Sequence, residues 1–348
     1  MEIKIGKRKI GDNHPVFIIA EMSGNHNKSF IRAKEIIYAA AEAGADAIKL
    51  QTYTPDTITI DCKNKWFKVH GKNKWSGRYL YDLYKEAQTP WDWQPKLKKY
   101  AQKLGLILFS TPFDATAVDF LENINVIAYK VASFEVVDIP LLEKIGKTKK
   151  PVIISRGMAT EIELRQAVKT LKINGTKEIA ILHCVSSYPA KAEDMNLSTI
   201  PELKKKFKTV SGLSDHSLGI LASCTAVSLG ANIIEKHITL SRKDGGPDSS
   251  FSLELNEFKE LVSSIREVET SIGKPQNGPL KSESQGISAR KSLFVVKDIK
   301  KGEKFTKENV HSIRPGYGLS PKFFKIIIQK SSRKNIKKGT PLSWGMTQ

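Results

Sequence analysis

The chain has 348 residues and 40% of them are hydrophobic, so it is long enough for one large core plus a small second domain, and disorder is not expected. The N-terminal stretch lacks the apolar region of a signal peptide, and no apolar run approaches the roughly 20 residues that a membrane-spanning helix needs. We therefore expect a cytoplasmic protein that does not span a membrane. The formal net charge of +20 is compatible with a nucleic acid, an acidic membrane or an anionic substrate as partner, and charge alone does not choose among them.

Lysine and cysteine usage narrow these options. Many lysines fall in predicted surface helices such as residues 201–208, a pattern that favours a solvated helix face over a groove that follows a nucleic-acid backbone. We therefore expect no nucleic acid and no membrane as partner. The three cysteines, Cys62, Cys184 and Cys224, are odd in number and widely separated, which gives neither a disulfide framework nor a CxxC metal pair. We expect reduced thiols that serve in packing.

From residue 16 onward, short apolar runs alternate with amphipathic helical stretches, for example residues 31–44 and 161–175. This alternation predicts βα units and a parallel sheet. We predict eight strands, at residues 16–21, 47–52, 106–111, 127–133, 152–157, 179–186, 209–216 and 232–237. Eight repeats over about 260 residues indicate an α/β fold of the (β/α)8 TIM-barrel type rather than an open sheet.

Two regions stand apart from the repeats. The first is a long insertion, roughly residues 53–100, which contains four of the five tryptophans and the near-repeat KNKW at 63–66 and 72–75. The second begins at a linker rich in Gly, Ser, Pro and Gln, residues 273–290. We therefore predict a catalytic barrel over residues 1–272 and a small domain over residues 291–348. That domain contains an internal near-repeat, DIKKG at 298–302 and NIKKG at 335–339.

Polar residues gather at the carboxyl ends of the predicted strands, which in a (β/α)8 barrel is the rim that carries the active site. Alternation along a strand places Lys49 with Gln51, Ser214 with His216, and Glu235 with His237 on common faces. The remaining members of this predicted ring are Glu21, Ser110, Thr111, Lys130, Ser133, Ser155, Arg156 and Ser186.

Each of these residue types suggests a functional role, and each also has a structural interpretation. A lone strand-end histidine is more often structural, but His216 and His237 on neighbouring strands favour a divalent metal with positions open to substrate and water. Lys49 and Lys130 within apolar strands favour an anion, such as a phosphate with a carboxylate, which the serine hydroxyls would also contact. Glu21 and Glu235 either neutralise these lysines or serve as general acid or base. His183 is interpreted as structural, and the tryptophans as packing residues or as a carbohydrate lid.

The strand-end motifs resemble those of the sialic acid synthase family, which condenses phosphoenolpyruvate with an N-acetylated amino sugar. The segment SIRPGYG at 312–318 resembles the antifreeze-like (SAF) C-terminal domain of the same family. The matching barrel stretches occur in order along the chain: IIAEMSGNHN (18–27), GADAIKLQTY (44–53), FSTPFD (109–114), AYKVAS (128–133), ISRGMAT (154–160), LHCVSSYP (182–189), GLSDHSLG (212–219), EKH (235–237) and GGPD (245–248).

The resemblance implies a role for each matching residue. Manganese or magnesium would be held by His216 and His237, and catalysis would involve Glu21, Glu235 and Tyr188. The sugar would contact Gln51, Asp248 and Arg314, the last of these reaching into the barrel of the other subunit of a homodimer. Phosphoenolpyruvate would be bound by Lys49, Lys130, Ser133, Ser155, Ser186 and Ser214.

Two departures from the N-acetylneuraminate enzymes resemble the pseudaminic acid synthase branch. HCVSSYP replaces their HCTNxYP, which puts Ser186 where they have asparagine, and SSFS follows GPD. The resemblance then implies a transferase that joins phosphoenolpyruvate to 2,4-diacetamido-2,4,6-trideoxy-L-altrose by C–C bond formation and releases phosphate by C–O cleavage. The methyl and acetyl groups of that sugar would suit an apolar, tryptophan-bearing rim.

Other functions remain open at this point. N-acetylmannosamine, or the sugar that gives legionaminic acid, could replace the altrose derivative in the same condensation. From a different class, the basic charge and the KNKW stretches could mark a single-stranded nucleic-acid binder, although the ring of polar strand ends would then be unexplained. The small domain could also be a ligand-binding module attached to a degenerate barrel.

Overall fold

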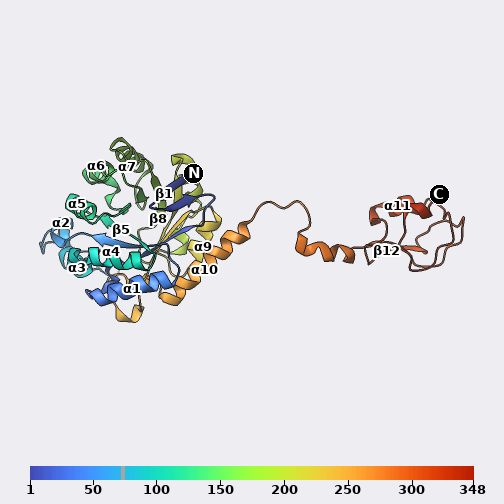
Figure 1. Ribbon diagram of the computed structural model, residues 1–348, viewed down its shortest axis with the longest axis horizontal. Helices are drawn as coiled ribbons and strands as arrows, with labels where there is room; N and C mark the ends of the chain where they lie inside the picture. The colour runs from blue at the N-terminus through green and yellow to red at the C-terminus, as the bar shows by residue number, and fades with distance from the viewer. Residues whose placement is uncertain (72–74) are drawn as a thin grey trace. The chain divides into compact units, whose positions relative to one another are not determined.

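The computed structural model describes residues 1–71 and 75–348, and these divide into two compact units, Met1–Gly273 and Lys274–Gln348 (Figure 1). The predicted boundaries at 272/273 and 290/291 remain a prediction. In the second KNKW stretch, residues 72–74 lie outside the described residues.

The first unit is a closed barrel of eight parallel strands, in the order β10-β3-β4-β5-β6-β7-β8-β9, with β9 also paired to β10. This confirms the predicted (β/α)8 barrel. The largest difference in strand length is at β6, which covers three residues of the predicted 127–133. The strands are β3 (Phe17–Glu21), β4 (Ala47–Thr52), β5 (Ile107–Pro112), β6 (Tyr129–Val131), β7 (Val152–Ser155), β8 (Ile179–Cys184), β9 (Val210–Asp215) and β10 (Ile233–His237).

Helices surround the strands (Figure 1) and begin where the sequence offers caps. The Ser29 side chain accepts a hydrogen bond from the Arg32 amide at the start of α1, and Thr160 and Glu163 form a capping box at the start of α7. Their buried apolar faces pack on the outer side of the sheet. The helices are α1 (Phe30–Glu42), α4 (Gln94–Lys103), α5 (Ala115–Asn123), α6 (Ile139–Lys147), α7 (Glu161–Ile173), α8 (Thr199–Phe207), α9 (Leu221–Ser228) and α10 (Leu255–Ile272).

A hairpin that the sequence reading missed precedes the barrel. Strands β1 (Glu2–Ile5) and β2 (Arg8–Gly11) pair antiparallel. Their buried isoleucines, Ile3, Ile5 and Ile10, pack in one cluster with residues of the barrel interior such as Phe17 and Val210. Because these interior residues lie at the amino ends of the strands, the hairpin covers the end of the barrel opposite to the polar rim.

The predicted insertion between β4 and β5 is shorter than expected, because its last part is the barrel helix α4. Before α4 come two short helices, α2 (Pro55–Ile58) and α3 (Leu80–Ala87). Two of its tryptophans are packing residues: the Trp91 indole donates to the Tyr53 carbonyl at 3.1 Å, and Trp93 packs edge-on against His26 and Phe30. Trp66 is 76% exposed.

The second unit has its own small apolar core around the antiparallel pair β11 (Ser292–Val295) and β12 (Val310–Ile313), with the short helix α11 (Phe324–Ile327). Its fully buried members are Leu293, Val295, Ile299, Phe305, Val310, Ile327, Ile336 and Leu342. A 3-10 helix, Lys281–Ala289, precedes β11.

The two similar pentapeptides of this unit, DIKKG and NIKKG, pair with each other. The amides of Ile299 and Ile336 each donate to the other's carbonyl at 2.8 Å. The Asp298 carboxylate accepts from the Lys338 amide, and Asn335 Oδ1 accepts from the Lys301 amide, each at 2.8 Å. The first side chain of each pentapeptide therefore caps the fourth residue of the other, which explains the repeat by a local two-fold arrangement.

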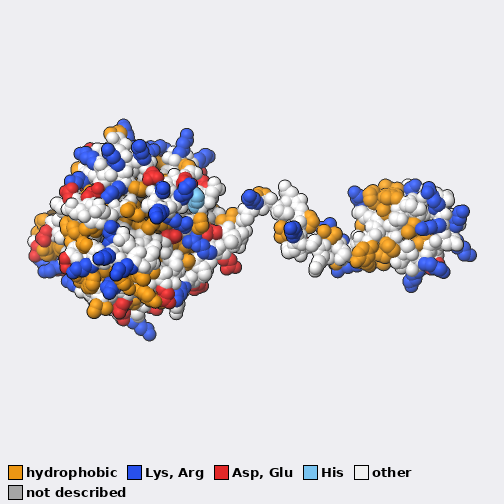
Figure 2. All heavy atoms as spheres, in the orientation of Figure 1, with side chains coloured by type: hydrophobic (Ala, Val, Ile, Leu, Met, Phe, Trp, Pro, Cys, Tyr) orange, Lys and Arg blue, Asp and Glu red, His pale blue; other side chains and the backbone are white. Residues whose placement is uncertain are grey.

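On the face shown in Figure 2, lysine and arginine side chains are scattered among acidic and hydrophobic ones, and they do not form a continuous stripe. Many of them pair with carboxylates, for example Lys144 with Asp119 and Lys259 with Glu42. No helix within residues 1–71 and 75–348 is long and apolar enough to cross a membrane.

Replacing Ile299 with Ala should selectively destabilise the second unit, because it leaves a cavity at the paired repeat; we expect about 2–5 kcal/mol. Hydrogen exchange of the full chain, followed by mass spectrometry, would show faster exchange in residues 292–348 and unchanged exchange in the barrel. The control Ile313→Ala, at a half-exposed side chain, should have a much smaller effect. Equal effects of the two substitutions would contradict the paired-repeat account.

Candidate active site

Strand alternation decides which side chains enter the barrel. On β4, Ile48 and Leu50 belong to the cluster beneath the helices, while Ala47 belongs to the cluster inside the barrel. Lys49 and Gln51 share the parity of Ala47 and therefore point inward at the carboxyl end. The predicted orientation of this strand is confirmed.

Four charged side chains meet at this end and are all buried. Lys49 Nζ lies 2.7 Å from Glu21 Oε2 and 3.7 Å from Glu235 Oε1, and it donates to Thr111 Oγ1 at 3.3 Å. Lys130 Nζ lies 4.0 Å from the same Glu235 oxygen. Glu235 therefore lies between two ammonium groups, and β3, β4, β6 and β10 each supply one member of a compact cluster of two positive and two negative groups.

The cluster drives the pKa values of its two carboxyls in opposite directions. Burial outweighs the attraction of Lys49 at Glu21, and Glu235 adds repulsion, so the pKa of Glu21 is raised. Burial also acts on Glu235, but Lys130 and Lys49 together outweigh it and lower the pKa of this carboxyl. Two carboxyls a few ångströms apart are therefore prepared for different roles.

The two ammonium groups differ for the same reason. Burial lowers the pKa of Lys49, but attraction by Glu21 and Glu235 exceeds this effect and leaves the pKa raised. Burial dominates at Lys130, so its pKa is lowered despite the attraction of Glu235. A bound anion would favour the charged form of Lys130.

Hydroxyl groups complete this side of the rim. Lys130 Nζ donates to Ser155 Oγ at 2.6 Å, and Ser214 Oγ donates to Glu235 Oε1 at 3.1 Å. Ser133 and Ser186 lie 2.8 Å apart, Oγ to Oγ. The chain passes so close to this pair at Gly157, which has a φ of +50°, that a Cβ there would lie 2.2 Å from Ser133 Cβ. Glycine is therefore required at 157, and the cradle of lysines and hydroxyls has the composition of an anion site.

The two predicted metal ligands lie together. The rings of His216 and His237 have centroids 5.3 Å apart. His216 Nδ1 lies 3.0 Å from the Val185 carbonyl, which can only accept, so Nδ1 carries the proton and Nε2 presents a lone pair. No group of three or more His, Cys, Asp or Glu side chains suited to a metal ion occurs within the described residues.

Behind the histidines lies an ion pair that the sequence reading missed. Asp215 and Lys236 each directly precede one of the two histidines, so their side chains point to the outer face of the sheet. Both side chains are fully buried, and their charged groups lie 2.9 Å apart. Asp215 also accepts hydrogen bonds from the hydroxyls of Ser217 and Ser223 at 2.6 Å, and Lys236 donates to the Ser217 carbonyl. This network fixes the ends of β9 and β10 and so the positions of the two imidazoles.

On the other side of the cluster, hydrogen bonds continue toward the loop after β10. Gln51 Nε2 donates to Glu21 Oε1 at 2.9 Å and to Ser23 Oγ at 3.0 Å, and the Ser23 hydroxyl donates to the Asp248 carboxylate. Gln51 and Asp248, both predicted to contact the sugar, are thus joined through Ser23, which the sequence reading did not select.

Tyr188 lies in an aromatic group over the histidines. Its ring centroid is 4.4 Å from that of His216, 5.3 Å from that of Phe251 and 5.5 Å from that of Trp75. Burial raises the pKa of Tyr188, so its hydroxyl remains a proton donor at neutral pH. The Trp75 indole also donates to the Pro247 carbonyl at 3.0 Å, which makes Trp75 the tryptophan of the insertion that contacts this group.

The structure thus brings most of the predicted site residues to one end of the barrel. Arg314 follows β12 in the second unit, where it is exposed, and its role in a partner's barrel remains a prediction. His183 lies apart from the site, with Nε2 2.5 Å from the Met195 carbonyl, as a structural histidine would.

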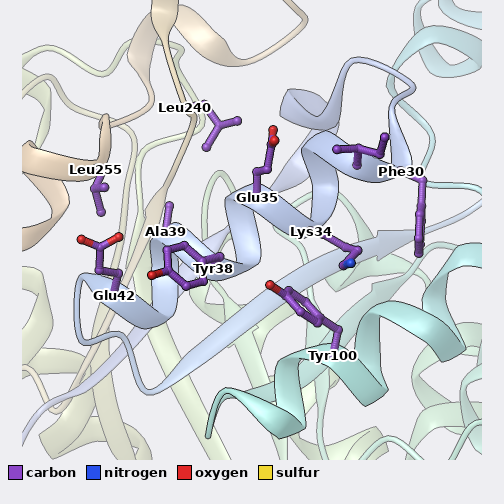
Figure 3. A pocket seen from close by; sticks show the side chains of 10 residues that line it. Phe30, Lys34, Glu35, Tyr38, Ala39, Glu42, Tyr100, Leu240 and Leu255 are labelled. Carbon is purple, nitrogen blue, oxygen red and sulfur yellow. The ribbon is translucent and has the colours of Figure 1, made fainter.

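A hollow of about 520 Å³ lies elsewhere in the first unit, on the flank formed by α1 and α4 (Figure 3). Tyr38, Ala39, Tyr100, Leu240 and Leu255 line its apolar part, and Lys34, Glu35 and Glu42 its polar edge. Its lining contains no residue of the polar rim, so it is separate from the candidate site.

Signals for the missed residues were weak. Glu21 was selected because it closes its strand, whereas Ser23 lies two positions beyond that strand end, and only its neighbour Gly24 suggests an unusual turn there. Asp215 and Lys236 stand within otherwise apolar strands, and a pair of opposite charges at matching positions on adjacent strands is a signal that could have identified them.

Fold and rim together define a class: a (β/α)8 barrel with buried charged and hydroxyl groups at the carboxyl ends of its strands, followed by a small β domain. The NeuB family model matches residues 36–277 and the SAF domain model matches residues 290–346.

Similar proteins and structures agree. The chain is 45% identical over 333 residues to a pseudaminic acid synthase of Campylobacter jejuni, covering 95% of this chain and 96% of the relative. It is 44% identical to a pseudaminic acid synthase of Helicobacter pylori, covering 94% and 97%. An N-acetylneuraminic acid synthetase from Leptospira borgpetersenii, in complex with citrate, superposes with a TM-score of 0.72 and 38% identity over 82% of this chain and 95% of that one. The chain belongs to the NeuB family and carries a SAF domain, as its motifs predicted.

Replacing Asp215 with Leu should destabilise the barrel by about 3–5 kcal/mol, because it leaves the Lys236 ammonium buried without its counter-ion. The double variant Asp215→Leu, Lys236→Met removes both charges and should recover a large part of that loss. Urea unfolding of the full chain measures both free energies. A double variant less stable than the single one would contradict the ion-pair account.

Proposed function

We propose that the chain is a pseudaminic acid synthase, which condenses phosphoenolpyruvate with 2,4-diacetamido-2,4,6-trideoxy-L-altrose and water to give pseudaminic acid and phosphate. The observation that carries the proposal is the buried cluster of Lys49, Lys130, Glu21 and Glu235 at the rim. Support comes from relatives named pseudaminic acid synthase that are 44–45% identical over nearly the whole chain.

Phosphoenolpyruvate is the natural occupant of the lysine and serine side of the rim. Its phosphate and carboxylate together carry more negative charge than one lysine can neutralise, and Lys49 and Lys130 are buried together there. We assign Ser133, Ser155, Ser186 and Ser214 as hydroxyl contacts that orient the same molecule. Binding of this anion would favour the protonated form of Lys130, whose pKa burial lowers.

The two histidines fit a divalent ion. His216 Nδ1 is held by the Val185 carbonyl, which leaves Nε2 as the ligand atom, and His237 lies on the adjacent strand. Among the described residues no further His, Cys, Asp or Glu completes a metal-binding group of three, so two imidazoles would leave positions for substrate and water, as a Lewis-acid site requires. When bound, manganese or magnesium would polarise the carbonyl oxygen of the open-chain sugar.

The chain's own residues supply the remaining chemistry. C3 of phosphoenolpyruvate attacks the sugar aldehyde carbon to form the new C–C bond, water adds at C2, and the tetrahedral adduct expels phosphate as its C2–O bond breaks. Glu21, protonated to a higher pH than an ordinary glutamate, is assigned as the general acid and base. Glu235 stays ionised between the lysines, and Tyr188 and Lys49 stabilise developing negative charge.

The proposal extends to assembly and location. We assign the functional form as a cytoplasmic homodimer in which Arg314 contacts the sugar in the partner's barrel. Mixing two inactive variants, Arg314→Ala and His237→Ala, would then restore up to about a quarter of the activity through mixed dimers, because one of the two sites in such a dimer has both residues.

The direct test is phosphate release from phosphoenolpyruvate and manganese with a panel of sugars. We expect release with the 2,4-diacetamido L-altrose sugar and at least about tenfold lower kcat/KM with N-acetylmannosamine or the legionaminic acid precursor, because buried polar groups left unpaired by the wrong sugar are costly. Preference for another sugar would keep the condensation and overturn the substrate. No release with any of them would overturn the proposed function.

Glu21→Gln should lower kcat by about 100- to 10,000-fold and remove the limb of the pH profile that comes from a carboxyl of raised pKa. The matched control is Glu135→Gln, since burial raises the pKa of Glu135 to about 7 although it lies outside the cluster. We expect the control to retain the limb. Loss of the limb in Glu135→Gln and its survival in Glu21→Gln would contradict the assignment.

His237→Ala should abolish Mn²⁺ binding by the folded protein, measured by calorimetric titration of Mn²⁺ alone, because one imidazole cannot hold the ion. His183→Ala is the matched control, since it removes a buried strand histidine that lies outside the site. Unchanged Mn²⁺ affinity in His237→Ala, with native circular dichroism, would contradict the metal assignment.

A further inference from the structure

Ser23 has a backbone conformation that serine rarely adopts. Its φ is +47°, in the left-handed region that favours glycine, asparagine and aspartate, and only 2% of the residue is exposed. Gly24, which could adopt this conformation at no steric cost, comes directly after Ser23. The left-handed residue is nevertheless the serine. A buried non-glycine residue in this region is strained and persists where the surrounding structure holds it, which makes Ser23 a candidate for a functional role.

The Ser23 hydroxyl uses both of its capacities. It donates to the Asp248 carboxylate and accepts from Gln51 Nε2 at 3.0 Å. Gln51 Nε2 has two hydrogens, and the other one goes to Glu21 Oε1 at 2.9 Å. With both amide hydrogens engaged, the orientation of the Gln51 amide is fixed and its Oε1 is the atom that can accept from a substrate.

The Ser23 hydroxyl joins the β3–α1 loop to the segment after β10, but other contacts already hold these segments together. Asn25 Nδ2 donates to the Ile238 carbonyl at 2.8 Å and to Ser252 Oγ at 2.9 Å. Arg32 pairs with Asp244 at 2.6 Å. These contacts connect the β3–α1 loop and α1 to the segment after β10 without Ser23, so a role in holding these segments together does not account for its strained backbone.

We propose that Ser23 is a positioning residue for the sugar: its hydroxyl holds the Gln51 amide and the Asp248 carboxylate so that both present acceptor oxygens to a donor group of the substrate. Hydroxyl hydrogens and the N–H of an acetamido group are donors of this kind. The inference rests on the proposed function, in which Gln51 and Asp248 contact the sugar, and it adds a residue that recognises the substrate through them.

The test uses Ser23→Ala and Ser23→Gly in the full chain. Both remove the hydroxyl, but only glycine relieves the backbone. We expect both to raise KM for the 2,4-diacetamido sugar by about tenfold, on the order of one lost hydrogen bond to a charged network. KM for phosphoenolpyruvate should stay within about twofold, because Ser23 does not contact the lysine and serine side of the rim. Ser23→Gly should melt at a higher temperature than Ser23→Ala.

Lys208→Gly is the matched backbone control. Lys208 is exposed and has a φ of +50° at the end of α8. Glycine at this position should raise the melting temperature and leave both KM values unchanged. This control therefore shows how replacing a left-handed residue with glycine changes the melting temperature and the KM values when the Ser23 hydroxyl is kept.

A double-mutant cycle separates positioning from general support. In a Gln51→Ala background, Ser23→Ala should have much less effect on the sugar KM, because the residue through which it acts is gone. Equal effects of Ser23→Ala in both backgrounds, or an unchanged sugar KM in both Ser23 variants, would overturn the positioning role while wild-type turnover leaves the proposed function standing. Failure of the wild type to release phosphate with any sugar would overturn the proposed function, and this role with it.

Discussion

Four buried charges at one end of a barrel are the constraint on which the rest of the site depends. Each buried ion costs several kcal/mol unless it is paired with good geometry. Glu21, Lys49, Lys130 and Glu235 come from four strands, and the first and last of these residues are more than 200 positions apart in the sequence. Only the closed order of the barrel brings each of them within 4.0 Å of an oppositely charged member of the cluster. Because the cluster balances two positive against two negative groups, an incoming anion finds lysines that are already desolvated and oriented.

Polar contacts extend from this cluster in both directions. Toward the proposed anion side, the Lys130 ammonium reaches the Ser155 hydroxyl, and toward the proposed sugar side, Glu21 reaches Gln51, Ser23 and Asp248. The histidines lie beside this chain of contacts and are supported from behind by the buried pair Asp215 and Lys236. A single network thus connects the two proposed substrate sites, so a change in charge at one of them is felt electrostatically at the other.

Strand alternation explains how much of this could be predicted from sequence. Eight apolar runs that alternate with helical stretches predicted the barrel. Lys49 and Gln51 within an apolar run, and the histidines at the ends of two consecutive strands, predicted the inward ring, because a two-residue period decides which side chains share a face. Motif resemblance then supplied the family, which the family models confirm. The relative pKa values of Glu21 and Glu235 could not be predicted, since they depend on distances to both lysines. Ser23 was not predicted as a site residue, because its position depends on a left-handed turn, and such a turn leaves no periodic pattern in the sequence. The hairpin of β1 and β2 was also not predicted, because its two four-residue strands precede the βα repeats and are too short to show a sustained alternation.

A crystal structure of the full chain with phosphoenolpyruvate tests the central claim most directly. The account predicts the phosphate and carboxylate of the ligand within hydrogen-bonding distance of the ammonium groups of Lys49 and Lys130, with serine hydroxyls from β7 and β9 beside them. Phosphoenolpyruvate bound elsewhere, for example at the flank of α1 and α4, with the ion pairs between the lysines and glutamates left undisturbed, would contradict it.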